Sequence, residues 1–152
     1  MKESTTSSDG GTRVGEVQEA LIRLVRATES MRARQAAKAG IGVTEMRALA
    51  RIVERGHETP KELAASLELS TGATTALIDR MESLGVIVRQ PNHQDRRSLT
   101  LLPTAHGETL METIREAFVE PMDAALGTTG DAALQRIAST LAAVADHFDQ
   151  AG

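Results

Sequence analysis

The segment that most constrains the fold runs from residue 59 to residue 107. It contains two helix starts in close succession, followed by two short apolar runs with a polar turn between them. The first start, Thr59-Pro60-Lys61-Glu62, is a capping box with proline at the first helical position. Ser70 gives the second start as an N-cap, and Gly85 ends the helix that follows. The inner stripe of this second helix is predicted to comprise Leu77, Ile78, Met81 and Leu84.

A strand pair is predicted directly after these helices. Val86-Ile87-Val88 reads as one strand and residues 99–102 as its partner. Residues 90–95, between them, are polar and rich in turn-forming residue types. Two short helices followed by a hairpin are the layout of a winged helix-turn-helix, a module that reads DNA. We therefore expect a mainly α fold with a small β-hairpin wing.

Further helices are predicted on both sides of this module. One covers residues 15–39, and a second, N-capped by Thr44, ends at Gly56. Thr104 opens a helix that Pro121 is expected to kink or end, and a last helix covers residues 131–149. The first of these helices carries apolar residues in a three-four alternation in which Thr28 occupies one position, and this pattern suits helix–helix packing: Val14, Val17, Leu21, Leu24 and Met31.

These patterns predict how the chain is organised. Residues 1–13 are expected to be a disordered tail and residues 14–152 a single domain, with the winged helix at 43–103. The helices at 14–40 and 104–150 are more apolar than a winged module requires. They either cover the core of that module or form a subunit interface. We favour the interface, because terminal helices pack poorly alone and a DNA reader gains from two-fold symmetry.

The composition excludes several other classes of protein. The chain has no cysteine, which rules out disulfides and thiol-based sensing, and its four histidines are scattered, so no metal site or other cofactor is expected. It has neither an apolar run long enough to span a membrane nor a secretory signal, which predicts a cytoplasmic location. It also lacks a phosphate-binding loop and a nucleophile paired with a base, so we expect no enzyme.

The net charge of −4 is distributed unevenly along the chain. Residues 43–103 hold 8 basic and 8 acidic residues, whereas residues 104–152 hold 2 and 8. The acidity therefore lies outside the module that is expected to read DNA, and local charge matters more for binding than the total.

Two groups of residues are candidates for DNA contact. The outer face of the helix after Ser70 carries small or hydroxyl side chains, which let a helix enter the major groove, and the hairpin carries arginines suited to the minor groove. The alternative is an ordinary solvated helix face and a solubilising turn. The candidates on the helix are Ser70, Thr71, Gly72, Thr75, Ala76 and Arg80, and those on the hairpin are Arg89, Asp95, Arg96 and Arg97.

With these motifs in place, the chain resembles the MarR family of transcriptional regulators. The motifs occur in the order and at the spacing of that family, from the helix before the capping box to the helix after the hairpin. The matching residues are Leu63-Ala64, Leu69-Ser70, Asp79-Arg80-Met81-Glu82, Leu84-Gly85-Val86-Ile87, Asp95-Arg96-Arg97, Thr104 and Gly107.

The resemblance implies a homodimer that places two winged helices on a pseudo-palindromic operator. By position it implies that Arg97 enters the minor groove with Asp95 as its partner, and that Asp79 braces the wing. Two positions depart from the family pattern. Ala76 stands where a long polar or basic residue often reads a base, and Pro103 replaces the usual leucine, which could shorten the second strand.

The resemblance also implies a repressor of nearby genes that a small aromatic or amphipathic acid releases from DNA. Four arginines could pair with the carboxylate of such an effector, although each could equally face solvent or phosphate: Arg23, Arg26, Arg47 and Arg51. The alternative function is a winged helix used for protein contact, or a helical scaffold without an operator. An apolar patch in place of a cationic surface at the reading helix would indicate this alternative.

Overall fold

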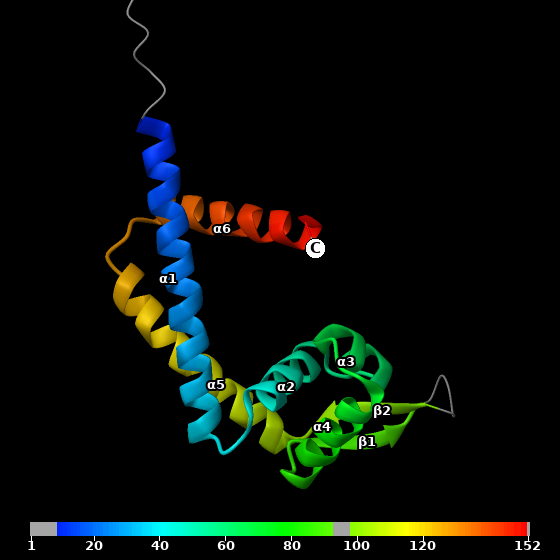
Figure 1. The fold of residues 1–152 in the computed structure, drawn as a ribbon. Coiled ribbons are helices and arrows are strands. Elements are labelled where there is room, and N and C mark those ends of the chain that lie inside the picture. The colour runs from blue at the N-terminus through cyan, green and yellow to red at the C-terminus, as the bar shows by residue number, and fades with distance from the viewer. Residues whose placement is uncertain (1–8, 93–97, 152) are drawn as a thin grey trace, which may run out of the picture. The chain divides into compact units, whose positions relative to one another are not determined.

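The computed structural model describes residues 9–92 and 98–151, and it confirms a mainly α fold with one antiparallel hairpin (Figure 1). It contains two compact units, one extending to Ile114 and the other beginning at Arg115. The single domain over residues 14–152 stays a prediction. The elements are α1 (Asp9–Lys38), α2 (Val43–Arg55), α3 (Pro60–Leu67), α4 (Thr71–Ser83), β1 (Ile87–Pro91), β2 (Leu99–Pro103), α5 (Ala105–Leu126) and α6 (Asp131–Ala151).

Several boundaries differ from the expected ones. Helix α1 begins at Asp9, so residues 9–13 are helical and do not belong to a disordered tail, while residues 1–8 lie outside the described residues. Gly42, in an extended conformation, is the N-cap of α2, and Thr44 lies inside that helix. Helix α5 continues through Pro121, so this proline does not end it, and β2 ends at Pro103, one residue beyond the predicted strand.

The lobe formed by α2, α3, α4 and the hairpin has an aliphatic core. Its centre consists of side chains that solvent hardly reaches, contributed by three helices and both strands. Because burial of apolar side chains is the main favourable term in folding, this core fixes the orientation of α4 relative to α2 and the hairpin. The core residues are Ala48, Leu49, Ile52, Leu63, Leu77, Ile78, Met81, Val86, Ile87 and Leu101.

Glu58 connects the hairpin to the helices. The strands pair in a register that sets Arg89 opposite Leu101. On its other edge, Leu101 exchanges two backbone hydrogen bonds with Glu58, of 3.1 and 2.7 Å. One residue of the α2–α3 connection therefore adds an isolated β-bridge to the outer edge of β2 at the base of the hairpin.

Helices α1 and α6 carry large apolar side chains that are exposed in the single chain. In α1, Val14 is 60% exposed and Val17 53%, and Ala36, near the C-terminal end, is its one buried residue among those described. In α6, Phe148 is 73% exposed. No described helix is both long and apolar enough to cross a bilayer.

Candidate nucleic-acid interface

The position of α4 follows from two local caps and one buried face. The Thr59 hydroxyl accepts a hydrogen bond from the Glu62 amide, and Glu62 accepts one from the Thr59 amide, so the expected capping box starts α3. The Ser70 side chain accepts a hydrogen bond from the Ala73 amide at 3.3 Å and caps α4, as the sequence predicted. With Leu77 among its buried residues, α4 turns its opposite face outward.

The outward face of α4 is open to solvent. All the helix candidates for DNA contact, Ser70 to Arg80, are exposed. An added methyl group at Gly72 would meet nothing within 4 Å, so this part of the helix is bare. Thr75 donates its hydroxyl to the Thr71 carbonyl at 3.0 Å, which leaves the oxygen free to accept. Small side chains and a bare backbone suit close approach to another surface.

Arg80 is held by an acid that the sequence did not single out. Its Nε donates to Oε1 of Glu45 at 2.7 Å, joining the C-terminal half of α4 to the first turn of α2. The Arg80 side chain is 57% exposed and that of Glu45 only 11%. The guanidinium therefore reaches solvent while its counter-charge is almost buried.

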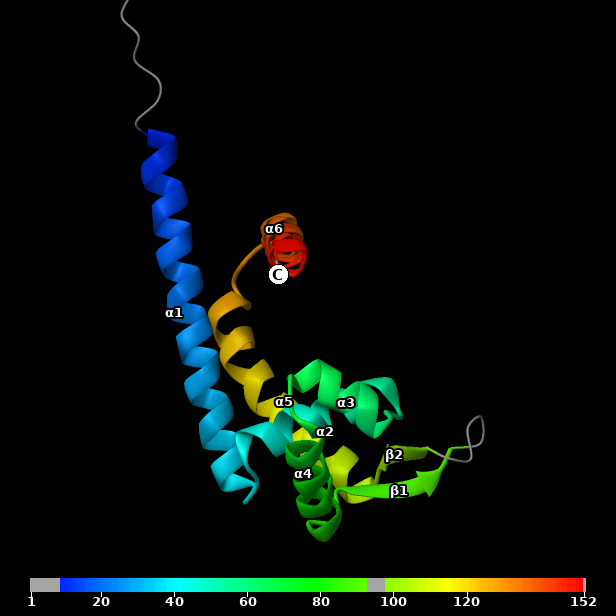
Figure 2. The same cartoon turned by 45° about the vertical axis from the view of Figure 1, so that its right-hand side comes forward.

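On the other side of α4, Arg89 of β1 is held by two acids. One guanidinium nitrogen pairs with Asp79, and Nη1 lies 3.1 Å from Oε2 of Glu82. Figure 2 shows α4 and β1 at the same edge of the lobe. The Asp79–Arg89 pair is the kind of contact that a wing-bracing role for Asp79 requires. Glu82, like Glu45, was absent from the candidates.

The remaining wing candidates, Asp95, Arg96 and Arg97, lie outside the described residues. Their expected contacts stay predictions. The hairpin is described up to Asn92 and again from Ser98, where the Asn92 amide donates to the Ser98 carbonyl at 3.0 Å.

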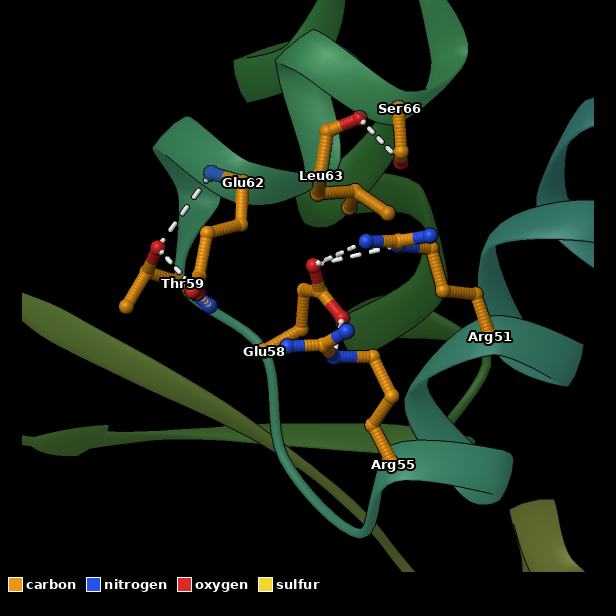
Figure 3. A network of polar contacts seen from close by, with 7 residues as sticks. All are labelled: Arg51, Arg55, Glu58, Thr59, Glu62, Leu63 and Ser66. Atoms are coloured by element: carbon orange, nitrogen blue, oxygen red, sulfur yellow. Dashed lines mark hydrogen bonds and ion pairs between the residues drawn. The ribbon is translucent and has the colours of Figure 1, made fainter. Parts of the chain in front are cut away.

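A buried carboxylate organises the end of α2 (Figure 3). Glu58 is fully buried, and Arg51 and Arg55 converge on it from one face of α2. Nε of Arg51 donates to Oε1 at 3.1 Å, and Nε of Arg55 lies 2.9 Å from Oε2. Within the described chain Oε2 accepts no aligned hydrogen bond, so its contact with Arg55 is an ion pair only.

This arrangement bears on the four arginines proposed for effector binding. Arg51 is engaged by Glu58, whereas Arg23 and Arg26 on α1 and Arg47 on α2 are exposed. The candidates therefore do not share one environment, and an effector site at them stays a prediction. Within the described ranges, no three histidine, aspartate or glutamate side chains group closely enough to hold a metal ion.

Three acids of the site, Glu45, Glu58 and Glu82, had only weak signals in the sequence. Glu45 lies in the first turn of a helix, where an acid is already favoured by the helix dipole, so nothing pointed to Arg80. Glu58 stands between a glycine that ends α2 and the capping box of α3, a place typical of a solvated loop. Glu82, three residues after Asp79, shares its helix face, which was the one available hint.

Comparison with known proteins shows which family has this architecture. The sequence model of the MarR family matches residues 41–99. The HTH-type transcriptional regulator YcgE of Bacillus subtilis (strain 168), itself uncharacterised, is 31% identical over 113 residues, which cover 71% of this chain and 73% of YcgE. The chain belongs to the MarR family. Its relatives are transcriptional regulators, and the winged helix-turn-helix is the regulators' DNA-reading module.

Two further comparisons extend the MarR assignment. The HTH-type transcriptional repressor MdtR of Bacillus subtilis (strain 168) is 30% identical over 77 residues, 51% of this chain and 50% of MdtR. The crystal structure of NadR in complex with 4-hydroxyphenylacetate has a TM-score of 0.64 and 25% identity, and the match covers 95% of this chain and 97% of NadR. This MarR-family chain is thus similar to one repressor and to one protein that binds a small aromatic acid.

Proposed function

We propose that the chain is a homodimeric, cytoplasmic repressor that binds a pseudo-palindromic operator in duplex DNA through α4 and the wing. The observation that carries this proposal is the outward face of α4, which is bare and polar and lies between two arginine ion pairs, Arg80 with Glu45 and Arg89 with Asp79. A helix of this kind fits the major groove, which is about 12 Å wide and admits one α-helix.

Individual contacts follow from the chemistry of this face. Ser70 and Thr71 lie at the N-terminus of α4, whose backbone amides favour a phosphate oxygen. Gly72, Thr75 and Ala76 would approach base edges, where the methyl groups of threonine and alanine suit thymine. Arg80 and Arg89 flank the helix and would face the phosphates. Asp95, Arg96 and Arg97 complete the wing in this proposal, as the sequence predicts.

The dimer is supported by the exposed apolar residues of α1 and α6. Burial of apolar surface contributes about 25 cal/mol per Å². At this value, covering side chains such as Val14, Val17 and Phe148 would stabilise the protein by more than about 1 kcal/mol each. A second copy of the chain would cover them. Two copies would also present two reading helices to the two halves of a symmetric site.

We propose that an aromatic or amphipathic acid is the effector, and that its binding releases the protein from DNA. NadR, similar over most of this chain, binds 4-hydroxyphenylacetate. A carboxylate of this class pairs with arginine, and Arg23, Arg26 and Arg47 are exposed on α1 and α2, with Arg51 as a fourth candidate if its pair with Glu58 opens.

Protein contact, the alternative function, lacks a matching observation on α4. The exposed residues of this helix are small or polar, and none is a large apolar side chain of the kind that anchors protein interfaces. The relatives are regulators, and no observation favours a catalytic role over regulation.

The test is selection of duplexes from a random pool by the full chain, followed by a gel shift. We expect enrichment of a symmetric sequence that the chain binds at least about a thousandfold more tightly than random duplex of equal length. Sedimentation of the free protein should show a dimer of the 16.2 kDa chain. A pool that stays random after repeated rounds, with the protein folded, would exclude operator recognition.

A further inference from the structure

Each side of α4 has an arginine that is paired with a carboxylate. With Leu77, Ile78 and Met81 facing the core, Arg80 projects toward α2, whereas Asp79 and Glu82 face the strand that carries Arg89. Each flank therefore presents one arginine, and each arginine is already paired with a carboxylate of its own lobe. A helix seated in the major groove has a phosphate strand on either side, so these are the flanks that phosphates would approach.

Most lysines and arginines in the described part of the lobe are paired in this way. Over residues 41–92 and 98–103 there are six lysines and arginines, and four of them form ion pairs with carboxylates there. The two without such a pair among the described residues are Arg47 and Lys61. Among these described residues, most of the positive charge is thus paired with a carboxylate of the protein itself.

The two flanks differ in how easily the carboxylate can withdraw. On the wing side, the side chains of Asp79 and Glu82 are 56% and 41% exposed, so each can rotate into water when a phosphate arrives. Glu45 has little such freedom. Its side chain is only 11% exposed, so it turns into water far less readily than the two acids on the wing side.

On the proposed function as a DNA reader, we infer that Glu45 is a fixed counter-charge that sets how strongly the lobe attracts DNA. A phosphate that approaches Arg80 must share the guanidinium with a carboxylate that stays in place. The attraction between Arg80 and phosphate is then offset by repulsion between Glu45 and phosphate. Glu45 lowers affinity for every DNA sequence alike, because phosphate contacts carry no sequence information.

The experiment compares Glu45→Gln with wild type on two probes, the selected duplex and a shuffled duplex of the same composition. Glutamine keeps an oxygen that accepts from Arg80 and removes the charge. We expect affinity to rise about threefold per subunit at about 0.1 M salt on both probes, within the range of an exposed ion pair. The slope of log affinity against log salt should steepen by about 0.9 per subunit, because Arg80 then displaces one more counterion.

Three further variants separate this effect from others. Glu54→Gln removes an exposed acid of α2 that is not paired with Arg80, and it should change affinity by less than the Glu45 variant. Arg80→Gln alone should weaken binding by less than about threefold, since its charge is already cancelled. In the double variant Glu45→Gln/Arg80→Gln the gain in DNA affinity should disappear, because it depends on an Arg80 side chain that has lost its counter-charge.

Unchanged or weaker binding by folded Glu45→Gln would overturn the inference, as would a gain that persists in the double variant. If Glu45→Gln does not fold, Arg80→Gln alone tests the inference. A loss of DNA affinity above about tenfold in this variant would show that Glu45 does not offset the attraction between Arg80 and phosphate. Failure of the wild-type chain to bind any duplex would contradict the proposed function instead, so the two failures are distinguishable.

Discussion

Gly107 lies against the backbone of Val86 so closely that a Cβ at position 107 would stand 2.1 Å from the Val86 carbonyl oxygen. The same junction holds Thr104, whose amide donates to that carbonyl at 3.1 Å and whose hydroxyl donates to the Gly85 carbonyl at 2.7 Å. The Thr104 hydroxyl also accepts from the Gly107 amide at 3.0 Å. The start of α5 is thereby fixed to the start of β1.

Gly107→Ala should therefore destabilise the protein severely, by about 3 kcal/mol, because a backbone carbonyl cannot move aside as a side chain can. Urea unfolding gives this difference as a shift of the midpoint. The matched control is Gly72→Ala, where the added methyl group meets nothing within 4 Å. Inside a helix that change should stabilise by up to about 1 kcal/mol. Equal effects at the two glycines would contradict the close approach.

Glu58→Gln should lower the free energy of unfolding by about 1–3 kcal/mol. The fully buried carboxylate balances Arg51 and Arg55, and its loss leaves two half-exposed guanidiniums with a neutral partner. Calorimetric or urea unfolding measures the change. Glu54→Gln on the exposed surface of α2 is the control and should be nearly neutral. A neutral Glu58→Gln would mean that the backbone pairing with Leu101 alone holds the wing root.

Removal of Glu62 should change how stability depends on pH. The hydrogen bond from the Thr59 side chain, then that from the Thr59 amide, lowers the pKa of Glu62 below its ordinary value of 4.5, with smaller effects from Arg55 and His57. Because the folded-state pKa is the lower one, Glu62 contributes stability above its unfolded pKa and loses it as pH falls through the folded value.

Urea midpoints measured from about pH 6 down to about pH 3 should fall less steeply for Glu62→Gln than for wild type. Thr59→Ala should flatten the same profile and cost about 1 kcal/mol near neutral pH through loss of the cap. Parallel profiles for wild type and Glu62→Gln would show that the carboxylate does not titrate with folding.

Arg89→Ala should destabilise the fold by about 1 kcal/mol or less at low salt, because it removes two partly exposed ion pairs to Asp79 and Glu82 and leaves the two acids facing each other. The loss should shrink in about 1 M salt, where the charges are screened over about 3 Å. Arg89→Lys, which keeps the charge, should recover part of the loss. A loss that is independent of salt would indicate packing by the arginine stem.

The helix caps and the apolar stripe of α4 could be predicted from the amino-acid sequence alone. The capping box at Thr59 and Glu62 and the cap at Ser70 depend on hydrogen bonds between residues three apart. The apolar stripe of α4 depends on helical periodicity, although Leu84, predicted as its last member, is the C-cap and is 42% exposed. Such features form within one turn of chain and need no knowledge of the rest of the fold. The order of these elements was sufficient to indicate a winged helix-turn-helix.

The pairing of the charged side chains could not be predicted, because it depends on how the helices and the hairpin pack together. Glu45 and Arg80 are 35 residues apart, and Glu58 meets Leu101 and two arginines of a neighbouring helix. The burial of Glu45 and Glu58 depends on how α2 crosses α4 and where the hairpin returns, and the packing of the whole core sets both. A carboxylate with no partner nearby in sequence looks like a solvated surface residue until that packing places an arginine beside it.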